Sequence, residues 1–189
     1  MVSRETSVPM KLIILARDVI IAHNPALPIE SAEAWIPVPG SLEAIARLTN
    51  AGYHVVAITG STPMLSIETL NRIHEKMHRL TLEAGGLIEA IFFNAGDEQA
   101  DENGASATLI LQDIRRRLKI NLRGAPVVSV AAGDFQAARK VGATPILVRP
   151  GAGVATPTEP IRLATVDLVF DDLVAVADFV LAQPDPMRQ

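Results

Sequence analysis

Short apolar runs rich in β-branched residues alternate along this chain with longer stretches in which apolar residues recur every three or four positions. This alternation is typical of β-α-β units, whose strands lie parallel to one another. The chain has 189 residues, of which 49% are hydrophobic, and this is enough for one domain of this type. We therefore predict an α/β fold with a doubly wound, Rossmann-like parallel sheet over residues 10–183, and loose tails at 1–9 and 184–189.

The apolar run at 11–18 is the first predicted strand, and it ends at Arg17 and Asp18. Further strands are expected at 53–59, 87–93, 127–130, 145–148 and 167–170. Helices are expected at 41–50, with Ser41 as N-cap, and at 65–83, 107–118, 134–141 and 173–182. The proline-rich segment 24–39 is predicted to lack regular structure. We find no internal repeat and no second domain.

Ligands of doubly wound sheets bind at the carboxyl ends of the strands, so the residues that follow each predicted strand are the candidate site. They are Ala16, Arg17, Asp18, Thr59, Gly60, Ser61 and Asp134. The Thr-Gly-Ser segment can bind an anion, or it can be an ordinary strand-to-helix turn. Asp18 can equally cap a turn, and Asp134 is expected as a helix N-cap or first-turn carboxylate.

The first strand and Asp18 resemble the first motif of haloacid-dehalogenase-type phosphatases, a strand followed by Asp-x-Asp. Scaffold stretches similar to this family recur in order at 33–48, 91–93, 136–143, 146–149 and 169–173. The order and spacing resemble the branch containing D-glycero-D-manno-heptose 1,7-bisphosphate 7-phosphatase and histidinol-phosphate phosphatase. The resemblance implies a haloacid-dehalogenase-like fold without a large cap domain.

The functional motifs of the family are only partly present. The position of the nucleophilic Asp maps to Ala16, whose methyl group can neither attack phosphorus nor hold Mg²⁺. The general acid/base maps to Asp18, and the phosphate-binding hydroxyl motif maps to Thr59 and the two residues after it. The resemblance therefore implies a phosphatase scaffold in which Asp18 is a vestigial acid/base.

The fourth motif of the family, Gly-Asp-x-x-x-Asp, has two alternative matches. An ungapped alignment places Ser129 and Val130 at Gly-Asp and Asp134 at the second Asp, whereas a gapped alignment makes Gly133 and Asp134 the Gly-Asp pair. We prefer the ungapped alignment because it preserves the lengths of the strand and the helix. A magnesium carboxylate is then missing here as well.

The family's zinc ligands and active-site lysine are also missing. The chain has no cysteine, segment 94–106 contains no histidine, and no lysine lies between Lys76 and Lys119. The carboxylates of this segment do not follow an EF-hand spacing, so we expect a solvated acidic loop. His74 and His78, spaced i and i+4, are interpreted as a coincidence on a helix surface rather than a metal site. No metal site is predicted, and Mg²⁺ would be needed only for residual activity.

These losses favour a catalytically inactive binding or scaffold protein, whose partner is a small phosphorylated ligand or another protein. The alternative is a Mg²⁺-dependent sugar-phosphate phosphatase with a site rebuilt around Asp18 or Asp134. The net charge of −4, with one basic cluster at 115–117, argues against nucleic acid and membrane partners. Because no apolar stretch approaches the ~20 residues of a membrane span, a cytoplasmic location is the default expectation.

Overall fold

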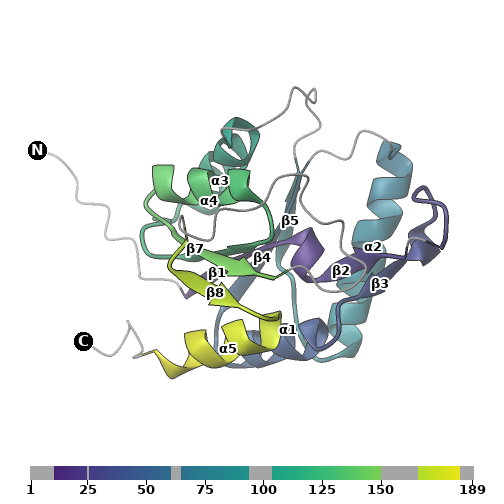
Figure 1. Cartoon of the computed structure of the whole chain (residues 1–189), viewed down its shortest axis with the longest axis horizontal. Coiled ribbons are helices and arrows are strands. Elements are labelled where there is room, and N and C mark those ends of the chain that lie inside the picture. The colour runs from purple at the N-terminus through teal and green to yellow at the C-terminus, as the bar shows by residue number, and fades with distance from the viewer. Residues whose placement is uncertain (1–10, 25, 61–64, 94–103, 150–165, 184–189) are drawn as a thin grey trace, which may run out of the picture.

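The computed structural model describes residues 11–24, 26–60, 65–93, 104–149 and 166–183 (Figure 1). Its centre is a six-stranded sheet in the order β5-β4-β1-β6-β7-β8, in which every neighbouring pair is parallel. The order reverses next to β1, which is the arrangement of a doubly wound sheet and confirms the predicted fold class. The strands are β1 (Leu12–Ala16), β4 (His54–Thr59), β5 (Ala90–Phe93), β6 (Pro126–Ser129), β7 (Thr144–Val148) and β8 (Leu168–Phe170).

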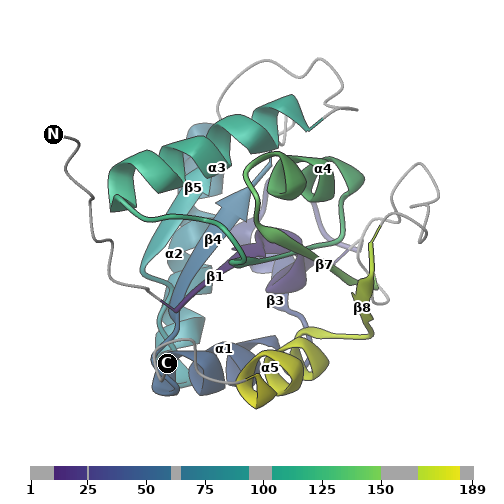
Figure 2. The ribbon, with the colours of Figure 1, turned by 90° about the vertical axis from the view of Figure 1, so that its left-hand side faces the viewer.

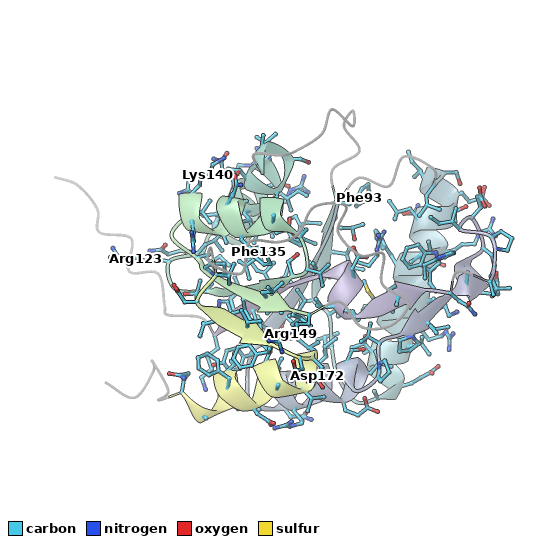
Figure 3. All side chains as sticks on the ribbon, in the orientation of Figure 1. Phe93, Arg123, Phe135, Lys140, Arg149 and Asp172 are labelled. Carbon is cyan, nitrogen blue, oxygen red and sulfur yellow. The ribbon has the colours of Figure 1, made fainter. Side chains whose placement is uncertain are left out.

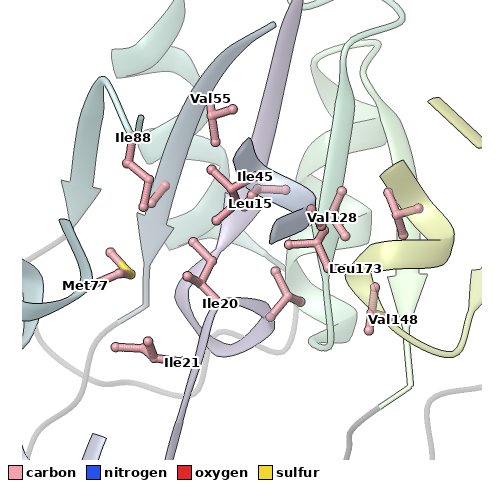
Figure 4. Close-up of a cluster of buried hydrophobic side chains, with 14 of the residues drawn as sticks. Leu15, Ile20, Ile21, Ile45, Val55, Met77, Ile88, Val128, Val148 and Leu173 are labelled. Atoms are coloured by element: carbon pink, nitrogen blue, oxygen red, sulfur yellow. The ribbon is translucent and has the colours of Figure 1, made fainter. Parts of the chain in front are cut away.

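Helices cover both faces of this sheet, as Figure 2 shows. They are α1 (Ser41–Asn50), α2 (Ile67–Glu83), α3 (Ala105–Leu118), α4 (Ala132–Lys140) and α5 (Leu173–Ala182). Alternate side chains of β1 enter two separate apolar clusters. Leu15 packs with α1, α2 and α5 through Ile45, Met77 and Leu173 (Figure 4), whereas Ile14 packs in the cluster that includes α3 and α4.

An antiparallel ribbon lies beside the main sheet and corrects one prediction. After the 3₁₀ turn Arg17–Val19, β2 (Ile21–His23) pairs with β3 (Trp35–Pro37), which follows a second 3₁₀ turn at Ala32–Ala34. The expectation that 24–39 lacks regular structure is therefore wrong. These strands are too short to show a period in sequence, and they form because Trp35 is buried in the core.

The start of α1 corrects a second prediction. Ser41 is the first helical residue rather than the N-cap, and its buried hydroxyl donates to the Ile20 carbonyl at 2.7 Å. The N-cap is Gly40, whose φ of 75° lies in the left-handed region, and a Cβ there would meet Val174 Cγ2 at 2.6 Å. The hydroxyl of Ser41 thus joins the helix to the turn after β1 rather than capping the helix.

The other predicted elements agree closely with the structure. Helix 173–182 has the predicted bounds, α4 begins two residues earlier than expected, and the strand predicted from residue 87 begins at Ala90. Among the described helices, none is long and apolar enough to span a membrane. The predicted tails lie outside the described residues, and so does most of the predicted acidic loop.

Candidate functional site

The carboxyl ends of β4, β1 and β6 lie side by side at one edge of the sheet. Ala16 is in register with Ile58, which precedes Thr59, and Leu15 is in register with Val128, which precedes Ser129. The topology therefore brings together the candidate residues that follow the first, second and fourth predicted strands. Ser61 lies outside the described residues.

Ala16 is the last residue of β1 and is 7% exposed. Its methyl group belongs to the apolar cluster that also contains Ile58 and Ile110. A methyl group in this place offers neither a lone pair nor a charge, so Ala16 itself cannot act as a nucleophile.

Arg17 lies in the 3₁₀ turn that follows β1. It is buried, whereas the sequence predicted only a residue on the rim of the candidate site. Its Nε donates to Asp18 Oδ1 at 3.0 Å, and its Cζ lies 4.5 Å from the ring centroid of Trp35. The ring of His23 lies 5.5 Å from the ring of Trp35. The β2–β3 ribbon therefore holds a guanidinium against the sheet edge through a cation–π contact.

Asp18 is the partner of Arg17 and is half-exposed. The residue at the N-cap of the 3₁₀ turn is Ala16 rather than Asp18, and Ala16 makes no side-chain capping hydrogen bond. The geometry therefore assigns Asp18 an ion pair with its neighbour.

Thr59, predicted as an anion donor, ends β4 with 1% exposure. Its Oγ1 lies 3.2 Å from Nε2 of His74, which is on α2. The hydroxyl is thus already within a buried hydrogen bond. Gly60 is exposed, and a Cβ built on it would meet nothing within 4 Å.

His74 is buried, so its interpretation as a surface residue is wrong. It is 8% exposed, and its ring centroid lies 5.8 Å from that of Phe93, labelled in Figure 3. Burial, and secondarily the charge of Arg17, lower the pKa of His74 to about 4. The imidazole is therefore neutral near pH 7. A signal was present in the sequence, since His74 lies three residues before Met77, on the face of α2 that packs into the core.

Asp134 lies in the first turn of α4, which confirms one of its two predicted roles, while the N-cap is Ala131. Its Oδ2 accepts a hydrogen bond from Ser129 Oγ at 2.5 Å. Ser129 Oγ in turn accepts from the N–H of Ala131 at 3.0 Å. The turn between β6 and α4 is therefore closed by its own hydrogen bonds.

These residues do not fit a magnesium site. Ala16 at the end of β1 and Val130 directly after β6 are apolar and nearly buried. Asp18 is paired with Arg17, and Asp134 is hydrogen-bonded to Ser129. Within the described ranges, no three His, Asp or Glu side chains are grouped so as to hold a metal ion.

Comparison with known proteins identifies relatives, although no family model matches the chain. A D-glycero-β-D-manno-heptose-1,7-bisphosphate 7-phosphatase of Bordetella bronchiseptica is 37% identical over 182 residues, covering 92% of this chain and 99% of the relative. The enzyme of the same name from Pseudomonas aeruginosa is 34% identical, covering 90% of this chain and 97% of the relative. The chain belongs to the heptose-bisphosphate phosphatase family. The predicted resemblance is therefore confirmed.

Solved structures of heptose-bisphosphate phosphatases agree with this assignment. The enzyme of B. bronchiseptica, in complex with magnesium and phosphate, superposes with a TM-score of 0.75 at 37% identity, covering 91% of this chain and 98% of that one. The enzyme of Burkholderia thailandensis gives 0.67 at 35% identity, covering 92% and 99%. A phosphoserine phosphatase at 19% identity and TM-score 0.60, covering 90% and 99%, shares the fold.

Proposed function

We propose that this protein is a member of the heptose-bisphosphate phosphatase family that binds a phosphorylated sugar but does not hydrolyse it through a phosphorylated enzyme. Ala16 at the carboxyl end of β1 is the observation that carries this proposal. The ligand class follows from the names of the relatives, which act on a heptose bisphosphate.

The chemistry of phosphoryl transfer supports the loss of hydrolysis. The reaction depends on a positioned nucleophile and on positive charge around the transferred group. Enzymes accelerate the hydrolysis of phosphate monoesters by up to ~10²¹, because the uncatalysed reaction is extremely slow. A methyl group at position 16 removes the nucleophile, and the carboxylates of Asp18 and Asp134 are already engaged with other side chains.

Binding, in contrast, needs only a preformed concave edge with a few polar groups. The carboxyl ends of β1, β4 and β6 lie side by side, with a buried guanidinium at Arg17 and an exposed glycine at Gly60. We therefore favour a small phosphorylated ligand over a purely structural role. The basic cluster at 115–117 adds little to ligand binding, since Arg116 and Arg117 both pair with Asp113 on α3.

A second candidate function is a working Mg²⁺-dependent phosphatase of the heptose-bisphosphate type. The relatives favour it, because they share 33–37% identity and carry that name. It would require Asp18 or Asp134 to act in a rearranged site. Water would then be the nucleophile in place of the carboxylate that is missing at position 16.

Phosphate release separates the two candidates. The purified protein is incubated with heptose bisphosphate and Mg²⁺ beside Asp18→Asn, with Asp178→Asn, an exposed carboxylate on α5, as the matched control. We expect equal background release from all three proteins. Release that is abolished by Asp18→Asn and retained by Asp178→Asn would refute the loss of hydrolysis and establish the second candidate.

Ligand binding is measured in parallel by calorimetric titration with the same sugar bisphosphate. Saturable binding without turnover is the expected result. Absence of both binding and turnover would overturn the proposal of a phosphosugar site. A scaffold role would then be the remaining interpretation.

A further inference from the structure

We infer, on the basis of the function proposed above, that the site accepts its phosphorylated ligand without a divalent cation, and that the Arg17 guanidinium supplies the positive charge. The solved relative from B. bronchiseptica contains magnesium together with phosphate. In this chain, several side chains at the carboxyl ends of the strands do not offer the oxygen ligands that magnesium takes.

Two neighbouring strand ends carry apolar side chains where a cation would need oxygen ligands. Ala16 ends β1 and Val130 follows β6, the strand that pairs with β1. Both side chains belong to apolar core clusters and are nearly buried. Hard cations such as Mg²⁺ bind through oxygen, so neither of these two side chains contributes a ligand.

The remaining carboxylates are held by other partners. Asp18 is ion-paired with Arg17, whose buried guanidinium is fixed against Trp35. Asp134 accepts the hydroxyl hydrogen bond of Ser129, and that hydroxyl is itself fixed by the N–H of Ala131. Each of these interactions places a protein partner on one oxygen of the carboxylate, at Oδ1 of Asp18 and at Oδ2 of Asp134.

The positive charge at this edge belongs to the protein itself. The guanidinium of Arg17 is a cation that is ion-paired with Asp18, and after burial it is the second cause of the lowered pKa of His74 on α2. His74 is neutral near pH 7 and adds no charge. Arg149, labelled in Figure 3, follows β7 and pairs with Asp171, so it belongs to the β7–β8 side of the edge.

The apolar residues at positions 16 and 130 lessen the negative charge that a ligand meets, and Arg17, Asp18 and Asp134 together sum to −1. Arg17 and Asp18 together are neutral, and Asp134 is the one further carboxylate among the described candidate residues. A phosphoryl group carries about −1.5 to −2 charges at pH 7. A cluster of converging carboxylates would repel it unless a cation intervened, whereas two apolar side chains at positions 16 and 130 do not.

Calorimetric titration of the wild-type protein with the sugar bisphosphate tests this inference, once in EDTA and once in excess Mg²⁺ at matched ionic strength. We expect the two dissociation constants to agree within about threefold. Binding that needs Mg²⁺ would overturn the inference while leaving the proposed ligand class intact. Absence of binding under both conditions would instead overturn the proposed function, and with it the metal-independent site.

Direct metal binding gives a second readout that needs no ligand. Mn²⁺, a paramagnetic substitute for Mg²⁺, is titrated into the protein and followed by its electron paramagnetic resonance signal. We expect no specific site in the wild type and a new site in the double variant Ala16→Asp/Val130→Asp, which restores two carboxylates. A specific Mn²⁺ site in the wild type would contradict the inference.

Two substitutions test the role of Arg17. Arg17→Met keeps an apolar stem against Trp35 but removes the charge, and we expect it to weaken ligand binding about tenfold or more. Arg17→Lys retains the charge and should recover part of the affinity. Arg47→Met, which removes an exposed guanidinium of α1, is the matched control and should bind normally. Wild-type affinity in a folded Arg17→Met would exclude Arg17 as the required cation.

Discussion

His74 makes the stability of this protein sensitive to acid. Its imidazole is buried beside Thr59 and Phe93, and its pKa falls from the ordinary value of 6.5 to about 4 in the folded state. Between these two values the unfolded chain binds a proton that the folded chain does not bind. Lowering the pH through this window therefore favours unfolding, and the stability contributed by the neutral imidazole is fully present only above about pH 6.5.

The size of the effect follows from the two pKa values. Linkage gives a loss of about 2 kcal/mol in the free energy of unfolding between pH 7.5 and pH 5, and about 3 kcal/mol by pH 4. Urea unfolding at a series of pH values measures this loss. At pH 5 most carboxylates are still ionised, so the imidazole dominates the slope in that range.

Two variants isolate the contribution of His74. His74→Gln removes the titrating ring and should flatten the dependence of stability on pH between about 7.5 and 5, whatever its effect on stability at pH 7.5. His54→Gln removes a half-exposed imidazole that pairs with Glu89 and should retain the wild-type slope. If His74→Gln showed the same slope as the wild type, the buried neutral imidazole would be excluded as its cause.

Three further substitutions, two of them with a matched control, test the packing and the turns by urea unfolding at neutral pH. Ile14→Ala removes a fully buried side chain of β1 and should cost about 2–5 kcal/mol, whereas Leu109→Ala, at a site 61% exposed on α3, should cost less than about 1 kcal/mol. Ser66→Ala removes the side chain that caps α2 through the N–H of Thr69 and should cost about 1 kcal/mol; an unchanged midpoint would refute the cap. Gly40→Ala should cost more than Gly52→Ala, because both residues have positive φ but only the first would place a methyl group against α5. Equal losses for the two glycines would show that the contact with α5 relaxes freely.

The fold was largely predictable because the signals that define it are local and long. The five residues of β1 are all buried, as a continuous apolar run predicts, and α5 has the predicted bounds. The β2–β3 ribbon was missed because each strand has three residues and depends on a partner elsewhere in the chain. Ser41 was misassigned because a serine before a helix usually caps it, whereas here the helix already begins at Ser41 and the hydroxyl donates to the Ile20 carbonyl.

The location of the candidate site was predictable and its contacts were not. Parallel topology alone places the residues after β1, β4 and β6 at one edge. The burial of Arg17 against Trp35, and the bond between His74 and Thr59, are contacts between segments far apart in sequence. No local pattern specifies such contacts. The loss of hydrolysis, the ligand and the metal independence stay predictions.

The contact between Arg17 and Trp35 also gives the site an optical signal. The chain contains one tryptophan, so its tryptophan emission arises from a ring whose centroid lies 4.5 Å from the guanidinium carbon of Arg17. A ligand anion that binds to this guanidinium would change the surroundings of the Trp35 ring. Occupancy of the sheet edge can therefore be followed by fluorescence in the unlabelled protein.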